Sequence, residues 1–144
     1  MIEKLLKIQQ ELKVPKNRRN TFGNYNYRSC EDIVDAAKPL CHAEGFCLIL
    51  TDEVIEIGGR VYVKATAKLL DGQTLAFVAE GWAREAETQK GMNEAQITGS
   101  ASSYARKYAL NGLFAIDDVA DADATNTHDK EQSVTPQPNN NFKI

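Results

Sequence analysis

The sequence predicts an α+β domain in which helices pack on a three-stranded antiparallel meander. Two turn signals, Gly58-Gly59 and Asp71-Gly72, separate three strand-like segments that follow one another in the chain. Apolar residues recur at helical spacing before and after these strands. A length of 144 residues with 42% hydrophobic residues fits one such domain and a tail.

Two helices are expected before the strands. Residues 2–12 place apolar side chains at helical spacing, and Pro15 stops this segment. Ser29 can cap a second helix, which Gly45 ends. Between the two helices, residues 22–28 form a polar and aromatic loop or short strand.

The sheet and the last helix occupy the middle of the chain. The three strands are expected at residues 46–57, 60–70 and 73–84. A charged linker follows, and residues 95–110 form the third helix, which Asn111-Gly112 ends. Residues 113–116 then form a short apolar anchor.

The composition changes at residue 117, which divides the chain into a domain, residues 1–116, and a tail, residues 117–144. The tail carries six acidic and two basic residues, whereas the domain carries 14 acidic and 15 basic residues. Because the tail is polar and acidic, it cannot bury enough apolar surface to order itself. We therefore expect a disordered acidic C-terminal tail, and the acidity of the whole chain does not exclude a nucleic-acid partner for the domain.

Several classes of function are disfavoured. No apolar run is long enough to cross a membrane, and the N-terminus lacks a signal-peptide core. Cys30, Cys41 and Cys47 are expected to be reduced thiols of a cytoplasmic protein. His42 and His128 are the only histidines, and neither a phosphate-binding loop nor a paired-histidine motif is present. The sequence thus predicts a protein that is not an enzyme, has no catalytic or metal-binding residues and needs no cofactor.

The second strand has one cationic face. Side chains alternate along a strand, so Arg60, Lys64 and Lys68 share a face with Tyr62 and Thr66. The cations are about 6–7 Å apart, a spacing that the phosphates of an extended nucleic-acid strand can follow. A solvated outer sheet face explains the same pattern.

The last helix has a second basic side. Ser103, Arg106 and Lys107 fall opposite the apolar stripe, among small residues that allow a backbone to approach. Tyr104 and Tyr108 fall on the apolar side and are expected in the core. Cationic solubility of this side remains an equal alternative.

The third candidate is the segment between the first two helices. It interleaves cations with aromatic rings that can stack on bases or hold the backbone: Arg18, Arg19, Phe22, Tyr25, Tyr27 and Arg28. Rings that anchor the loop against the sheet are the alternative.

Residues 91–114, and especially 96–114, closely resemble the signature of the ERF ("essential recombination function") family of phage single-strand annealing proteins. Residues 25–29 and 31–33 also resemble that family, so the resemblance covers about residues 1–116. It implies a β-β-β-α annealing-protein core. It also implies a protein that binds single-stranded DNA and anneals complementary strands without ATP during phage recombination.

The resemblance further implies a ring or helical homo-oligomer with DNA in a groove between the sheet and the following helix. By position, that groove would use the 60–68 face with Arg106 and Lys107. A phage exonuclease or a host single-strand-binding protein would be a further partner, in the bacterial host cytoplasm. Two other classes stay open: a protein that protects single strands without annealing them, and a metal-dependent nuclease, which the missing ligand cluster disfavours. The complete set of expected DNA-binding residues is Arg106, Lys107, Arg60, Lys64, Lys68, Tyr62, Arg28, Tyr25, Tyr27 and Ser103.

Overall fold

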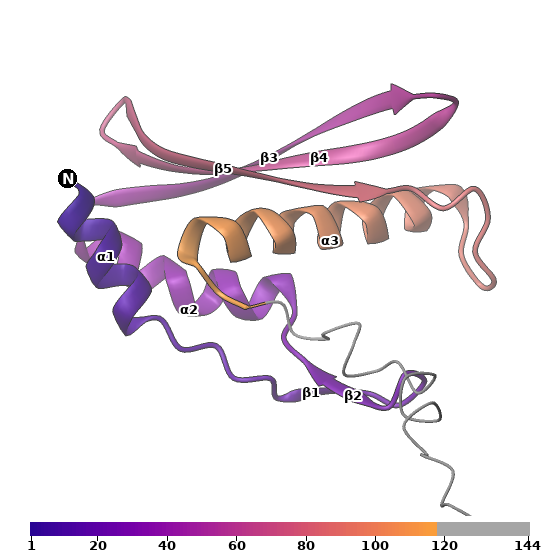
Figure 1. The fold of residues 1–144 in the computed structure, drawn as a ribbon, viewed down its shortest axis with the longest axis horizontal. Helices are drawn as coiled ribbons and strands as arrows, with labels where there is room; N and C mark the ends of the chain where they lie inside the picture. The colour runs from indigo at the N-terminus through magenta and orange to yellow at the C-terminus, as the bar shows by residue number, and fades with distance from the viewer. Residues whose placement is uncertain (118–144) are drawn as a thin grey trace, which may run out of the picture.

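The computed structural model describes residues 1–117 (Figure 1). The expected disorder of the tail falls on residues 118–144, which lie outside the described residues. The elements are, in chain order, α1 (Ile2–Glu11), β1 (Arg18–Asn20), β2 (Tyr25–Tyr27), α2 (Cys30–Ala43), β3 (Phe46–Ile57), β4 (Arg60–Asp71), β5 (Thr74–Arg84) and α3 (Glu94–Phe114).

The predicted three-stranded antiparallel meander is confirmed. Its strand order is β3-β4-β5, and both neighbouring pairs are antiparallel. Gly58 and Gly59, with φ of +59° and +76°, turn the chain between β3 and β4. A two-residue turn of this kind needs positive φ at both positions, which glycine adopts without a steric penalty. The turn signals in the sequence therefore set the topology of the sheet.

Helix α3 packs on one face of this sheet, as Figure 1 shows. Val63, Ala65, Ala67 and Leu69 of β4 are buried on that face. Gly81 of β5 lies opposite Ala65 in the register, and it allows the helix backbone to come very close. Small residues at the contact therefore set a short distance between helix and sheet.

Helices α1 and α2 form a further layer on the side of α3 that faces away from the sheet (Figure 1). Leu5 and Ile8 of α1 and Ile33, Ala37 and Cys41 of α2 are buried in the same core as the α3–sheet contact. Helix α3 is consequently covered on two sides. This explains how a helix with many small residues holds a central place in the fold.

One local prediction was wrong. Helix α3 continues to Phe114, so Asn111-Gly112 lies inside the helix and Leu113 and Phe114 are not a separate anchor. Burial of Leu113 and Phe114 in the core stabilises this last turn, which ends at Ala115 with a left-handed φ of +54°. The segment before α2, for which the sequence left a loop or a short strand open, contains the short strand β2, which pairs antiparallel with β1 and places Tyr27 opposite Arg18.

Candidate nucleic-acid interface

An aromatic and cationic groove lies where the β1–β2 hairpin and the start of α2 meet α3. The Lys107 ammonium is 5.9 Å from the centre of the Tyr27 ring and 5.5 Å from that of Tyr104, both cation–π distances. A cavity of about 290 Å³ opens beside them; we call it the Lys107 groove. Its lining is Tyr27, Arg28, Ser29, Cys30, Ser100, Ser103, Tyr104 and Lys107.

The sequence placed Tyr104 and Tyr108 in the core, and this was wrong. Tyr104 is 47% exposed and Tyr108 is 38% exposed, with ring centres 6.3 Å apart. Ala101, Ala105 and Ala109 occupy the contact with the sheet instead. Helical spacing alone cannot tell whether these tyrosines are buried or exposed, because they lie at the border of the buried stripe of the helix. They add aromatic surface that the sequence analysis missed.

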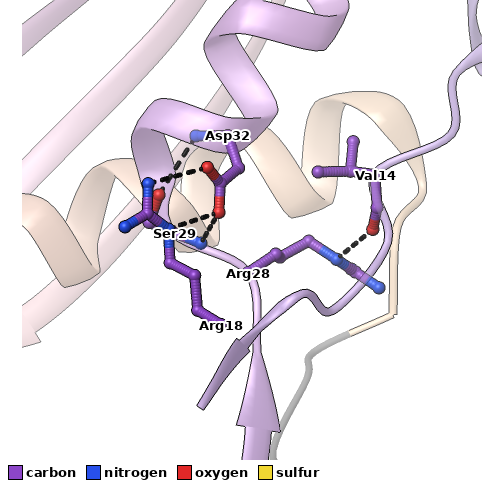
Figure 2. A network of polar contacts seen from close by, with 5 residues as sticks. All are labelled: Val14, Arg18, Arg28, Ser29 and Asp32. Atoms are coloured by element: carbon purple, nitrogen blue, oxygen red, sulfur yellow. Dashed lines mark hydrogen bonds and ion pairs between the residues drawn. The ribbon is translucent and has the colours of Figure 1, made fainter. Parts of the chain in front are cut away.

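Arg28 is buried, and its charge is engaged with the backbone. Its guanidinium donates to the carbonyl oxygen of Val14 at 2.9 Å, as Figure 2 shows, and to that of Asp117 at 2.7 Å. These bonds join the chain after α1 to the chain after α3. Arg28 therefore forms a wall of the Lys107 groove and fixes the hairpin that carries Tyr27.

A second network orients the hairpin on α2 (Figure 2). Arg18 donates two hydrogen bonds to the Asp32 carboxylate, at 2.8 and 3.0 Å. Ser29 and Asp32 complete a capping box, so Ser29 begins α2 as the sequence predicts. The bonds from Arg18 and from the Ser29 backbone hold the pKa of Asp32 well below its usual range.

Arg106 is tied to the sheet. Its guanidinium donates to the carboxylate of Asp52 in β3 at 3.0 Å, and the Ser102 hydroxyl donates to the same carboxylate. Burial raises the pKa of Asp52, but these hydrogen bonds outweigh burial and hold that pKa below its usual value. Arg106 thus anchors α3 to β3, whereas Lys107 faces the groove.

The cationic row of β4 lies on the opposite face of the sheet. Because Ala65 faces α3, its neighbours Lys64 and Thr66 must face away. The Lys64 ammonium is 3.2 Å from Glu53 and 3.8 Å from Glu80, and it lies 5.6 Å from the Trp82 ring centre. Within one chain the sheet separates Arg60, Tyr62, Lys64 and Lys68 from the α3 cations, so the expected single groove does not form.

The remaining expected residues lie near the Lys107 groove. Tyr25 packs edge-on against Tyr27, with ring centres 6.1 Å apart, and its hydroxyl accepts a bond from Asn20. Cys30 lines the groove, and burial raises the pKa of its thiol. Tyr25, Tyr27, Arg28, Ser103 and Lys107 are thus gathered on one side of α3.

A second groove, which the sequence analysis did not find, lies between α3, the end of β5 and the linker that joins them. Its volume is about 360 Å³, and Tyr104 lines both grooves. We call it the Ile97 groove. Its lining is Ala83, Arg84, Ala86, Gln89, Ile97, Ser100, Ala101, Tyr104 and Tyr108.

Two kinds of feature are absent from residues 1–117. No helix of that part is long and apolar enough to cross a membrane. Nor do three or more His, Cys, Asp or Glu side chains gather there in a way that could hold a metal ion.

These observations define a class of protein: an α+β domain with a basic and aromatic groove beside its last helix. The ERF superfamily profile matches residues 1–143, and the chain belongs to this superfamily. It is 53% identical to the "Essential recombination function protein" of Salmonella phage P22 over 133 residues. That alignment covers 92% of this chain and 63% of the phage P22 protein, so the chain spans less than two thirds of that relative.

Proposed function

We propose that this protein takes part in phage DNA recombination by binding single-stranded DNA and annealing complementary strands without ATP. The observation that carries the proposal is the Lys107 groove, in which one ammonium lies within cation–π distance of both the Tyr27 and the Tyr104 ring. Membership of the ERF superfamily and the name of the phage P22 relative support a role in recombination.

The groove has the groups that sequence-neutral binding needs. The Lys107 ammonium can pair with a phosphate, and the two tyrosine rings can stack on bases of any sequence. Ser100 and Ser103 are small, so the sugar-phosphate backbone can approach α3 closely. Annealing requires that the base edges stay accessible to a second strand. A site dominated by backbone contacts and stacking meets that need.

One copy of the groove is too small to hold a long strand, so several copies must act along the DNA. Multiple weak contacts in series raise the overall affinity far above that of one groove. Self-association is therefore part of the proposal, and the bacterial host cytoplasm is its expected setting.

The first prediction concerns Lys107→Ala. Each phosphate that a cation neutralises contributes about −0.7 to the slope of log K against log salt for single strands. The variant should bind labelled oligothymidylate several-fold more weakly, with a salt slope less steep by about 0.7. Fluorescence anisotropy at four or five salt concentrations measures both quantities.

Two matched variants make this test specific. Lys38→Ala removes an exposed cation of α2 outside the groove and should leave both quantities unchanged. Lys68→Ala reports on the outer sheet face. A slope that changes in Lys68→Ala but not in Lys107→Ala would place the DNA on the outer face. If the native chain bound single strands but did not accelerate the pairing of complementary oligonucleotides, a strand-protecting protein would be favoured instead.

A further inference from the structure

The tip of the β1–β2 hairpin presents one apolar ring to solvent. Phe22 is fully exposed, while the chain around it is well braced. The Asn20 side chain accepts hydrogen bonds from the backbone N–H groups of Phe22 and Gly23, both at 2.9 Å. Arg19 donates to the side chains of Asn24 and Asn26, which lie on the far side of the turn. These contacts fix the turn but bury none of the Phe22 ring.

The same molecule has a cavity that suits such a ring. Much of the Ile97 groove is apolar or aromatic: Ala83, Ala86, Ile97, Ala101, Tyr104 and Tyr108. A cavity of about 150 Å³ is enough to bind benzene in a protein core, so about 360 Å³ accommodates a phenyl ring. Tyr104 and Tyr108 can also meet that ring edge to face, which aromatic pairs prefer.

We infer that Phe22 of one copy inserts into the Ile97 groove of a second copy. The two surfaces differ, so the contact is heterologous, and its repetition generates a ring or an open helical row. This inference deepens the self-association included in the proposed function by naming the contact. It does not depend on DNA binding.

Charge favours a protein occupant of the groove over a nucleic acid. The hairpin and its flanks, residues 16–28, contain four basic and no acidic residues. Arg84 lines the Ile97 groove, but the ten residues that follow it, 85–94, contain three acids and one base. With Arg84 included, the groove and this linker carry three acids and two bases, a slight excess of negative charge that favours a basic hairpin over a phosphate chain.

The contact also has a consequence for the Lys107 groove. Tyr104 lines both grooves, so a hairpin in the Ile97 groove lies next to the proposed DNA site. Successive copies then place their Lys107 grooves in one series, with a neighbour's hairpin at each junction. A long strand could thus pass from copy to copy.

Sedimentation velocity of the full chain without DNA tests the contact. Phe22→Ser should weaken self-association at least tenfold, because an aromatic anchor buried in a pocket contributes strongly to binding. Phe22→Leu keeps an apolar side chain and should retain most of the association. Undiminished association of Phe22→Ser would overturn the inference. If that variant associated normally but no longer bound oligothymidylate, the ring would be a base-stacking group instead.

Mixing two defective variants tests the heterologous geometry. Ala86→Trp fills the groove from the exposed linker but leaves the hairpin intact. Phe22→Ser and Ala86→Trp should each associate poorly alone. In an equimolar mixture, the intact hairpin of Ala86→Trp can enter the intact groove of Phe22→Ser. The mixture should therefore form pairs that grow no further, because each pair has only one intact contact. A mixture that stays monomeric would contradict the inference.

Cross-linking keeps the test valid if Ala86→Trp folds poorly. In a background that carries both Cys30→Ser and Cys47→Ser, Phe22→Cys combined with Gln89→Cys should form covalent ladders under oxidation, because Gln89 lines the groove. Each cysteine alone should form at most dimers. Ladders that fail to form at concentrations where the native chain associates would overturn the contact.

Discussion

Asp32 connects three parts of the molecule through one carboxylate. It accepts two bonds from Arg18 of β1 and one from the Ser29 backbone, and its own backbone N–H completes the cap of α2. The charged form is therefore favoured in the folded state, where the pKa of Asp32 lies well below its usual range. This network holds the hairpin that carries Tyr27 and Phe22.

The acid sensitivity of Asp32 gives the prediction at the residue scale. A carboxyl group whose pKa is depressed by folding contributes stability above its unfolded pKa, about 3.9, and loses it as pH falls through the folded pKa. Asp32→Asn should lower the free energy of unfolding by about 1 kcal/mol at pH 7, a typical cost for a lost helix cap. That difference should shrink from about pH 5 downward. Urea unfolding at several pH values measures it.

Asp35→Asn is the matched control for this prediction. Asp35 is exposed in the same helix, three residues further along the chain. Its replacement removes a carboxylate from the same helix but none of the hydrogen bonds of Asp32, so the free energy of unfolding at pH 7 should stay close to that of the native chain. A deficit of Asp32→Asn that stays constant from pH 7 to pH 2 would show that the network acts through shape and not through charge.

At the scale of elements, the contact between α3 and β5 depends on the smallness of Gly81. A Cβ atom at this position would lie 2.3 Å from the Ala105 carbonyl oxygen and 2.4 Å from the Ala109 nitrogen. Both are helix backbone atoms, which cannot rotate away as a side chain does. The close approach therefore excludes every residue larger than glycine without a shift of α3.

Gly81→Ala should destabilise the protein by about 1–3 kcal/mol, the usual cost of overpacking. Gly99→Ala is the control, because its Cβ would meet nothing within 4 Å and alanine favours a helix interior. That variant should be neutral or more stable by up to about 1 kcal/mol. Thermal unfolding followed by circular dichroism ranks the two variants, and equal melting temperatures would contradict this account of the contact.

At the scale of the whole molecule, the end of the described chain closes the fold. The Ile116 N–H donates to the Asn111 carbonyl oxygen at 2.9 Å, and Ile116 packs against the core. The Asp117 carbonyl oxygen accepts the bond from Arg28. Residues 116 and 117 thus take part in the packing of the domain, next to the boundary at residue 116 that composition indicates.

Two truncations test this boundary. A chain that ends after Val119 keeps these contacts and should retain its stability and, under the proposed function, strand annealing in vitro. A chain that ends after Phe114 loses both hydrogen bonds and the Ile116 packing, which should cost about 1–3 kcal/mol. If the chain that ends after Val119 lost strand annealing, the acidic tail would be part of the annealing machinery.

Much of the fold was predictable because its signals are local. Ser29, the two turn signals and the alternation along β4 each act on neighbouring residues, and the structure has the predicted helices and meander strands in the predicted order. The boundary of α3 was missed at Asn111-Gly112 because burial of Leu113 and Phe114 overrides a local stop signal.

The site was less predictable than the fold. Arg28, Arg106 and Lys107 are indistinguishable as cations in the sequence, yet their partners differ. Two of them bond Val14 and Asp52, which lie 14 and 54 residues away, while Lys107 faces two tyrosine rings. Such pairings depend on which elements meet, and no local pattern encodes them.

The sequence by itself determined the order of the elements, the turns of the meander and the two faces of β4, because backbone sterics and side-chain alternation are properties of neighbouring residues. The tertiary structure decided which face α3 covers. It thereby placed the cations of β4 and those of α3 on opposite sides of the sheet. The physical reason is close packing: α3 approaches where Gly81 and the buried alanines leave room for its backbone.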